Sequence, residues 1–268
     1  MAPAVWVIVP TYNEAGSIEP LLRALAGVLS GVAPGDHRIL VVDDGSPDGT
    51  AALAQRLGEQ ELDGVVEVLR RPGKAGLGRA YLAGFARALE GGAQLVCQMD
   101  ADLSHDPAHL PALLAAAEHA DLVLGSRYVP GGGVADWGPL RRVVSRAGSR
   151  YARTILRLPQ RDLTGGYKVI RRKLLEAIAL EHVRSQGYVF QIEITYRAVL
   201  AGFRVVEAPI TFRDRTAGAS KMSPPIALEA MWRVPLLRWG VPRSLAAWRS
   251  SPRVIPRPPA RTSGRSGC

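Results

Sequence analysis

Short apolar runs alternate with amphipathic stretches along this chain, and this alternation is the feature that most constrains its fold. Five runs are predicted to be strands, at residues 5–9, 39–42, 65–69, 95–99 and 121–124, and the run at 95–99 is typical of a buried strand. Between them, leucines and alanines recur at the three- and four-residue spacing of helices packed on one face. Strands and helices that alternate in this way form right-handed βαβ units. The sequence therefore predicts an α/β fold whose mostly parallel sheet is flanked by helices.

Polar loops follow four of these strands, at the edge where an open parallel sheet binds its ligands. They cover residues 12–14, 43–48, 100–106 and 126–127. Asp48 is readily explained as a turn former before a glycine, and this explanation is weaker for the pair Asp43 and Asp44. No Gly-x-Gly-x-x-Gly follows the first strand and no Walker A loop occurs. A nucleotide bound here would therefore be held through carboxylates and a divalent cation.

The loop after the fourth strand contains two aspartates one residue apart, Asp100 and Asp102. Both carboxylates can reach one hard cation, and Mg²⁺ or Mn²⁺ held in this way keeps positions for substrate phosphates. The alternative is a loop of solvated acids that caps the next helix. Asp106 followed by Pro107 is a suitable helix start and fits that alternative.

The charge of the chain indicates an anionic partner. Its 268 residues include 34 Lys and Arg against 24 Asp and Glu, a net charge of +10. Such a balance suits nucleic acid, a phospholipid surface or a phosphorylated substrate. The two cysteines, Cys97 and Cys268, cannot build a disulfide framework or a cysteine zinc site. The N-terminus lacks the pattern of a secretory signal, and no run approaches the ~20 apolar residues that span a bilayer. We expect a cytoplasmic protein with peripheral membrane contact.

Residues 139–158 predict a helix with an apolar face beside a basic stripe. At ~100° per residue, one arc contains Leu140, Val143, Val144, Ala147, Tyr151 and Ile155. The adjoining arc contains Arg142, Arg146, Arg150, Arg153 and Arg157. This pattern suits a helix at an anionic membrane surface, and the alternative is a helix packed on the sheet with solvated arginines. The lack of acids from residue 140 to 161 favours the anionic partner.

Four stretches together resemble family 2 glycosyltransferases of the GT-A fold, and within that family polyprenol (dolichol) phosphate mannose synthases. They are Val9-Pro10-Thr11-Tyr12-Asn13-Glu14, residues 42–50, Gly76-Leu77-Gly78-x-Ala80-Tyr81 and residues 99–107. The similarity extends from about residue 5 to residue 221. It implies an enzyme of the dolichyl-phosphate β-D-mannosyltransferase type. Such an enzyme transfers mannose from GDP-mannose to a polyprenyl monophosphate, depends on a metal and inverts the anomeric centre.

The resemblance also implies roles for individual residues. The expected nucleotide-sugar-binding residues are Pro10, Tyr12, Glu14, Val42, Asp44, Asp100, Ala101, Asp102, Arg215 and Lys221. Asp100, Asp102 and Ser104 are the expected ligands of Mg²⁺ or Mn²⁺; some relatives have Gln in place of Ser104, whose hydroxyl would ligate directly or through water. The acceptor phosphate is expected to meet Arg127, Arg141 and Arg142. The expected catalytic residues are Asp102, Arg127 and Arg215.

Several further residues keep two interpretations. Asp162 is either an acid near the sugar or a cap, and Gln191 and Glu193 are either site residues or structural ones. His105 and His109 are expected at a helix start. No catalytic histidine pair is needed, because a phosphate monoester with a second pKa near ~6 is already an anionic nucleophile.

The boundaries follow from composition and resemblance together. Residues 1–221 are the predicted GT-A catalytic domain. The loop from Arg213 to Lys221, whose part from Arg215 to Lys221 matches the family's Arg-x-x-Gly-x-Ser-Lys pattern, is expected to fold over the diphosphate. Residues 222–248 combine tryptophans with arginines and predict an amphipathic membrane-surface segment without a transmembrane span. Residues 249–268 predict a disordered basic tail. The lack of spans in turn suggests an integral-membrane partner, and a location on the inner face of the plasma membrane.

Two other functions stay open on the sequence. The same fold could use another donor, such as UDP-glucose, with the same lipid acceptor. A basic, non-catalytic protein that binds nucleic acid or membranes is a different class. The chain has no helix-turn-helix or zinc spacing and no strand face that interleaves aromatic and basic residues, so we expect no nucleic-acid partner.

Overall fold

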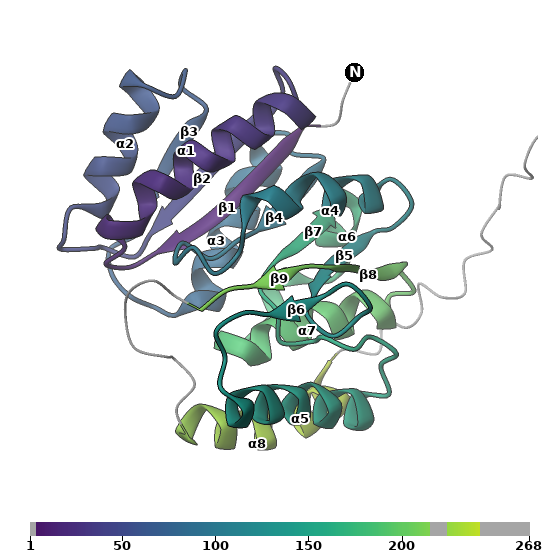
Figure 1. Cartoon of the computed structure of the whole chain (residues 1–268). Coiled ribbons are helices and arrows are strands. Elements are labelled where there is room, and N and C mark those ends of the chain that lie inside the picture. Colours follow the sequence, from purple (N-terminus) through teal and green to yellow (C-terminus); the bar gives the residue numbers. More distant parts are fainter. Residues whose placement is uncertain (1–3, 215–223, 242–268) are drawn as a thin grey trace, which may run out of the picture.

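A seven-stranded sheet forms the centre of the molecule (Figure 1), in a computed structural model that describes residues 4–214 and 224–241. The strand order is β3-β2-β1-β4-β7-β5-β8. The strands are β1 (Val5–Thr11), β2 (His37–Asp43), β3 (Val66–Arg70), β4 (Leu95–Gln98), β5 (Leu122–Ser126), β7 (Lys168–Arg171) and β8 (Val205–Pro209). A small second sheet pairs β6 (Gly133–Val134) with β9 (Thr211–Phe212).

The predicted mostly parallel sheet is confirmed, with one reversed strand. β1 to β4 run parallel to one another, and so do β5 and β8. β7 runs antiparallel to both of its neighbours, β4 and β5. The five strands expected from apolar runs are all present, whereas β7 was not predicted as a strand. It is only four residues long and begins and ends with a cation, so it lacks the apolar pattern of the others.

Helices cover both faces of the sheet. They are α1 (Ala15–Val32), α2 (Thr50–Gln60), α3 (Leu77–Glu90), α4 (Leu110–Ala117), α5 (Pro139–Leu156), α6 (Arg172–Ala177), α7 (Gly187–Leu200) and α8 (Pro224–Gly240), with 3₁₀ turns η1 (Pro107–His109) and η2 (Leu180–His182). Because strand side chains alternate between faces, Val7 packs in one core with α1, α2 and α4, and Ile8 in another with α3, α6 and α7. The first core is closed by helices that the helical spacing predicted, whereas the short helix α6 in the second core was not predicted.

A third apolar cluster joins α5, α7 and α8. Within it, α5 and α8 lie side by side at one end of the molecule (Figure 1). The expected helix at residues 139–158 is confirmed as α5, but its packed face differs from the apolar arc. The buried positions are Ser145, Ser149, Ala152 and Leu156. Leu140 remains 76% exposed, and Val143 and Val144 are also exposed. Small side chains thus face inward because they allow close packing, and part of the apolar arc faces solvent.

The reversed strand contributes a buried cation to the centre of the molecule. Lys168 is 1% exposed and stands opposite Gln98 of β4. Its Nζ donates to the carbonyl oxygen of Gln191 at 2.6 Å and to Oγ1 of Thr195 at 3.1 Å. Burial lowers the pKa of Lys168 to about 7, because removal from water penalises the ammonium form.

This shift predicts a rise in stability toward alkaline pH. The unfolded chain keeps the Lys168 proton up to a pKa near 10.5, so the penalty for burying the charge is complete below pH 7 and disappears as the pH approaches 10.5. We expect the contribution of Lys168 to the free energy of unfolding to increase by up to about 4 kcal/mol between pH 7 and pH 10. Urea unfolding of the wild type and of Lys168→Met at each pH measures this contribution as the difference between their free energies of unfolding. A difference between the two proteins that does not change with pH would contradict the prediction.

Candidate active site

Asp43 joins the ends of two strands at the carboxyl edge of the sheet. Its Oδ1 accepts from Oγ1 of Thr11 at 3.0 Å and from Oγ of Ser46 at 2.6 Å, and its Oδ2 accepts from the Ser46 N–H at 2.9 Å. Asp48 accepts from the N–H groups of Thr50 and Ala15, each at 3.0 Å, at the starts of α2 and α1. The turn interpretation is confirmed for Asp48, and Asp43 is structural as well.

Asp44 lies at the same edge, in contact with a basic segment. It is buried and forms an ion pair with Arg71, and its Oδ2 accepts from the Ala75 N–H at 3.3 Å. The ring of Tyr12 is 37% exposed, with the Lys74 ammonium 4.3 Å from its centroid. Two expected nucleoside residues therefore lie beside cations that sequence reasoning did not single out.

The other expected nucleoside residues lie around the same loops. Pro10 and Val42 are opposite each other in the β1–β2 register, and the Val42 side chain is completely buried in the core. Val42 can therefore present only its backbone to a ligand. Glu14 stands before α1, where its N–H donates to Oγ1 of Thr50 at 3.0 Å and its Oε2 accepts from Oγ of Ser17 at 3.0 Å.

Hydrogen bonds orient the two aspartates that follow β4. Oδ1 of Asp100 accepts from the hydroxyl of Tyr81 at 3.1 Å. Oδ1 of Asp102 accepts from Oγ of Ser104 at 2.5 Å and from its N–H at 3.1 Å. Leu103, between Asp102 and Ser104, has a backbone φ of +62°. Residues with a side chain rarely adopt this left-handed conformation, and where they do it often marks a functional loop. This turn lets Ser104 reach back to Asp102.

His105 supports the backbone of this loop. Its Nδ1 accepts from the Asp100 N–H at 3.1 Å, and the ring contacts those of Tyr167 and Phe212. Burial lowers the pKa of His105 despite the nearby carboxylates, which keeps Nδ1 available as an acceptor. The expectation of a helix start is wrong for His105, which precedes the turn η1, and is confirmed for His109. Asp106 caps that turn by accepting from the Ala108 N–H at 2.9 Å, as expected.

The donor set suits a hard divalent cation that is shared with a ligand. Asp100, Asp102 and Ser104 supply oxygen donors, which Mg²⁺ and Mn²⁺ prefer. Gly166 passes so close that a Cβ there would lie 3.4 Å from both carboxylate oxygens of Asp100. Within residues 4–214 and 224–241, no group of three His, Cys, Asp or Glu side chains could hold a metal ion. The carboxylate pair would therefore need additional ligands from the substrate or from water.

Tyr81 donates a hydrogen bond to Asp100 of this pair. It is completely buried between the rings of Phe85 and Phe190, whose centroids lie 6.2 and 5.8 Å away. Burial, and next the charge of Asp100, raise the pKa of Tyr81 well above its usual value. Its hydroxyl thus keeps its proton and fixes the orientation of the Asp100 carboxylate. Tyr81 lies in a stretch that carried the family resemblance, yet no role was assigned to it.

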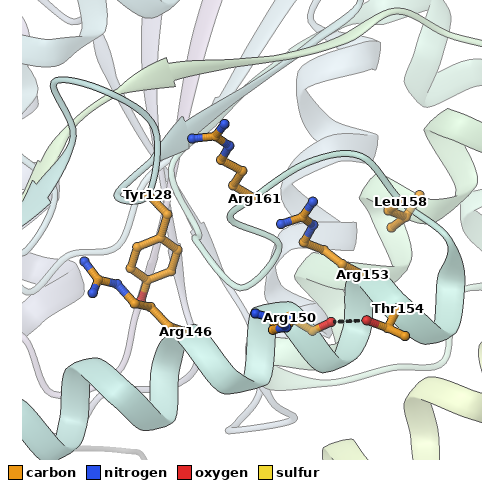
Figure 2. Close-up of a pocket in the computed structure, with 7 residues that line it drawn as sticks. All are labelled: Tyr128, Arg146, Arg150, Arg153, Thr154, Leu158 and Arg161. Carbon is orange, nitrogen blue, oxygen red and sulfur yellow. Dashed lines mark hydrogen bonds between the residues drawn. The ribbon is translucent and has the colours of Figure 1, made fainter.

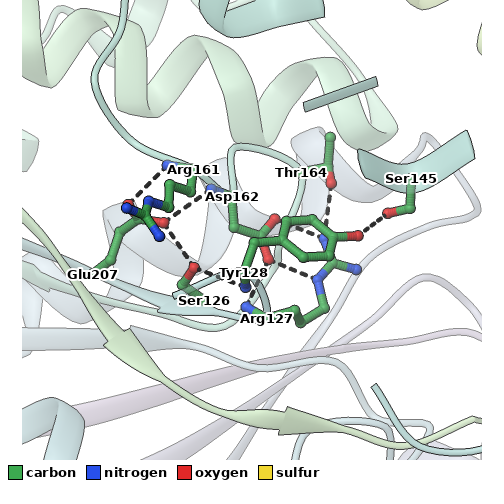
Figure 3. A network of polar contacts seen from close by, with 8 residues as sticks. All are labelled: Ser126, Arg127, Tyr128, Ser145, Arg161, Asp162, Thr164 and Glu207. Carbon is green, nitrogen blue, oxygen red and sulfur yellow. Dashed lines mark hydrogen bonds and ion pairs between the residues drawn. The ribbon is translucent and has the colours of Figure 1, made fainter. Parts of the chain in front are cut away.

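A buried ion pair lies beside the carboxylates (Figure 3). Nε and Nη2 of Arg127 donate to the two oxygens of Asp162, each at 2.7 Å, and Nη2 also donates to Oγ1 of Thr164 at 2.9 Å. The Asp162 N–H donates to Oε1 of Glu207 at 2.9 Å, and Oγ of Ser126 donates to the same oxygen at 2.7 Å. Burial alone would raise the pKa of Asp162, but the Arg127 charge and hydrogen bonds lower it. Asp162 is therefore the fixed counterion of Arg127.

The remaining predicted residues are placed separately. Arg141 forms an ion pair with Asp214 at 2.6 Å and lies over the ring of Trp137, whereas Arg142 is exposed on the next position of α5. Glu193 is structural, since its Oε1 accepts from Nε of Arg197 at 2.8 Å within α7. Arg215, Lys221 and the predicted loop between them lie outside the described residues, and so does the predicted tail.

Comparison with known proteins identifies the family of the chain. The model of glycosyl transferase family 2 matches residues 6–179, and the chain belongs to this family. It is therefore a glycosyltransferase, with the GT-A-like fold that the resemblance implied. In the part of the chain that the structure describes, no helix has both the length and the apolar character needed to cross a bilayer.

Two curated relatives are similar over most of their length. The polyprenol monophosphomannose synthase of Mycolicibacterium smegmatis is 49% identical over 236 residues, 88% of this chain and 86% of that protein. The undecaprenyl-phosphate mannosyltransferase of Micrococcus luteus is 47% identical over 237 residues, 88% of this chain and 94% of that protein. The expected likeness to polyprenol phosphate mannose synthases is thus confirmed.

Among solved structures, the fold is similar to that of glucosyl-3-phosphoglycerate synthase from Mycobacterium tuberculosis in complex with Mn²⁺, UDP-glucose and phosphoglyceric acid. The TM-score is 0.64 at 20% identity, over 90% of this chain and 81% of that one. At this identity the likeness supports the fold alone.

Proposed function

We propose that the protein transfers mannose from GDP-mannose to a polyprenyl monophosphate, giving polyprenyl phosphate mannose and GDP. The observation that carries the proposal is the pair Asp100 and Asp102, held at the carboxyl edge of the sheet by Tyr81 and Ser104. The two curated relatives, whose names specify polyprenol and undecaprenyl phosphate mannose transfer, support the choice of substrates. Sugar and acceptor would meet between this pair and the Arg127 network.

The donor would lie along the edge formed by β1, β2 and β4. Tyr12, Glu14, Asp44 and the backbone of Pro10 and Val42 would hold its nucleoside. Asp100, Asp102 and Ser104, next to Ala101, would hold Mg²⁺ or Mn²⁺. When bound, the cation would neutralise charge on the departing diphosphate. Arg215 and Lys221 would add positive charge as the leaving group departs.

The acceptor would be positioned by arginines and needs no strong base. Its phosphate is already anionic near neutral pH, because the second pKa of a monoester is ~6. Arg127 keeps its charge beside Asp162, and Arg141 and Arg142 follow at the start of α5. Held in line with the bond to the diphosphate, the phosphate oxygen would attack the anomeric carbon from the opposite face. The reaction would therefore invert the configuration at that carbon.

The exposed apolar residues of α5 and α8 would place the enzyme on an anionic membrane that contains the lipid acceptor. Leu140 and Val143 on α5 and Trp232 and Trp239 on α8 are all exposed, and arginines flank them in both helices. Tryptophan and arginine together are typical of segments at a membrane–water interface. We place the enzyme on the inner face of the plasma membrane, beside an integral-membrane partner protein.

Loss of the exposed tryptophans is expected to weaken membrane binding. Trp232 and Trp239 are 77% and 73% exposed, so Trp232→Ser with Trp239→Ser removes apolar surface without opening a core. At ~25 cal/mol per Å² of apolar surface, we expect vesicle binding to fall at least about tenfold in a sedimentation assay. By contrast, Val234→Ser on the same helix replaces a buried side chain and is expected to lower the melting temperature. Unchanged vesicle binding of the tryptophan variant would contradict this placement.

A transfer assay tests the proposed reaction directly. Purified protein is incubated with Mg²⁺, polyprenyl phosphate in detergent, and labelled GDP-mannose or labelled UDP-glucose. Label is expected to move from GDP-mannose into the organic phase, and EDTA is expected to abolish this transfer. Transfer from UDP-glucose alone would contradict the proposed donor, GDP-mannose, and would leave the proposed acceptor unchanged. Transfer that persists in EDTA would overturn the metal requirement.

A further inference from the structure

An open cavity of about 690 Å³ lies between α5 and the loop that follows it (Figure 2). Its lining residues are Tyr128, Arg146, Arg150, Arg153, Thr154, Leu158 and Arg161. Three of the arginines come from α5 at spacings of four and three residues, which place them along one side of a helix. Arg161 comes from the segment between α5 and β7, so both walls of the cavity are basic.

None of these four arginines forms an ion pair with a carboxylate within the described chain. The ion pairs among residues 4–214 and 224–241 include none formed by Arg146, Arg150, Arg153 or Arg161. Glu207, which lies near Arg161 in Figure 3, accepts from its backbone N–H at 2.8 Å. Like charges that line one cavity repel one another unless an anion lies between them. The cavity therefore has the electrostatic character of an anion site.

Arg153 supplies an independent indication. Its Nε is shielded from solvent and makes no hydrogen bond within the described residues. Buried donors are nearly always paired in folded proteins, and an exception calls for an explanation such as an absent ligand. In Figure 2 the Arg153 side chain rises from α5 into the space beside Arg161. A bound anion would give this N–H the acceptor that the protein lacks.

The cavity is distinct from the residues assigned to the acceptor. Arg127 donates to Asp162, and Arg141 pairs with Asp214; neither lines the cavity. Tyr128 connects the two regions, since the guanidinium carbons of Arg127 and Arg146 lie 5.3 and 5.5 Å from its ring centroid. The Tyr128 hydroxyl donates to Oγ of Ser145 at 2.7 Å, which fixes the ring against α5. A ligand in the cavity would thus lie next to the proposed acceptor site without sharing its arginines.

We propose that this cavity is a second anion site, which binds the phosphate group of a ligand other than the donor and the acceptor. Guanidinium groups bind phosphate through paired hydrogen bonds, and four of them suit a group that carries one or two negative charges. The phosphate can belong to a phospholipid headgroup or can be inorganic phosphate from solution. The inference does not depend on which sugar the enzyme transfers.

The test compares two double variants of the full-length protein. Arg150→Gln with Arg153→Gln removes two charges from the cavity. Arg56→Gln with Arg204→Gln removes two charges from exposed positions outside both the cavity and α5 and serves as the control. Inorganic phosphate is titrated calorimetrically in EDTA, so that Asp100 and Asp102 carry no cation. In parallel, sedimentation measures binding to phosphatidylcholine vesicles with and without phosphatidylglycerol.

The cavity variant is expected to bind at least about tenfold more weakly than the control, because hydrogen bonds to a charged group are among the strongest in proteins. Loss in the phosphate titration would identify free phosphate as a ligand. Loss with phosphatidylglycerol vesicles alone would identify the lipid headgroup. Equal behaviour of the two variants in both assays, or a wild type that binds neither probe, would overturn the proposal. If the cavity variant does not fold, Arg146→Gln with Arg150→Gln replaces it.

Discussion

Asp102→Asn is expected to lower the rate of sugar transfer by about 10²–10³-fold, the loss typical when one group that stabilises transition-state charge is removed. Asparagine keeps the shape of the side chain and an oxygen that can accept from Ser104, whose hydroxyl lies 2.5 Å from Oδ1 of Asp102. It removes the negative charge that would hold the divalent cation against the donor diphosphate. The transfer assay with labelled donor measures the effect, at saturating Mg²⁺ or Mn²⁺.

Asp106→Asn is the matched control for this substitution. Asp106 lies four residues further along the same loop and accepts from the Ala108 N–H at 2.9 Å as the cap of η1. Asparagine caps helices as well as aspartate does, so transfer by this variant should stay near the wild-type rate. Transfer by Asp102→Asn at a near-normal rate would contradict the assignment of Asp102 as a metal ligand.

Asp162→Asn is expected to destabilise the protein by about 3–5 kcal/mol, the usual result of removing one partner from a buried ion pair. Arg127 and Asp162 have side chains that are 6% and 0% exposed, so the guanidinium charge would remain buried without its counterion. The amide also turns one of the two acceptor oxygens into a donor that faces the donors of Arg127. Urea unfolding at neutral pH measures the loss.

The pH dependence has a definite sign. Burial favours the protonated Asp162, but the Arg127 charge and the hydrogen bonds to the carboxylate together outweigh it and lower the pKa. The stabilisation by the pair is therefore complete above the pKa of the unfolded chain, near 3.8, and is lost as the pH falls through the folded value. As a control, Asp214→Asn breaks the partly exposed pair with Arg141 and should cost less than about 1 kcal/mol. If Asp162→Asn and Asp214→Asn lowered the free energy of unfolding by similar amounts, burial of the ion pair would not determine its contribution to stability.

The sequence was most informative where one strand or one loop carried the whole signal. Apolar runs indicated five strands, and the runs of β1 and β4 are continuous because a parallel strand covered on both faces needs apolar side chains throughout. The half-buried β3 contains Glu67 and gave a weaker pattern. Asp100 and Asp102 were identified because their spacing after such a run has a direct chemical meaning. The helix start at Asp106 followed from local capping chemistry, which depends on neighbours in sequence alone.

Contacts between distant segments could not be predicted in this way. The antiparallel position of β7 depends on pairing with β4, about seventy residues earlier in the chain, and the four residues of β7 have no periodicity that indicates it. Asp43 and Asp44 are identical side chains in adjacent positions, yet one crosslinks Thr11 and Ser46 and the other pairs with Arg71. Similarly, the apolar arc of α5 was visible, but the choice of Ser145 and Ser149 as its inward face follows from packing on distant helices.

Because β7 comes late in the sequence, the central sheet can be completed only in two stages as the chain is synthesised. The four parallel strands β3, β2, β1 and β4 all lie within the first 98 residues, and they can pair as soon as that length has left the ribosome. The outer edge of β4 then has no partner until Lys168–Arg171 is made, several seconds later at ~5–20 residues per second. An unpaired strand edge is a template for association with other chains. The strand that leads directly into Asp100 and Asp102 thus keeps an unpaired edge, which a chaperone could protect, until β7 is made.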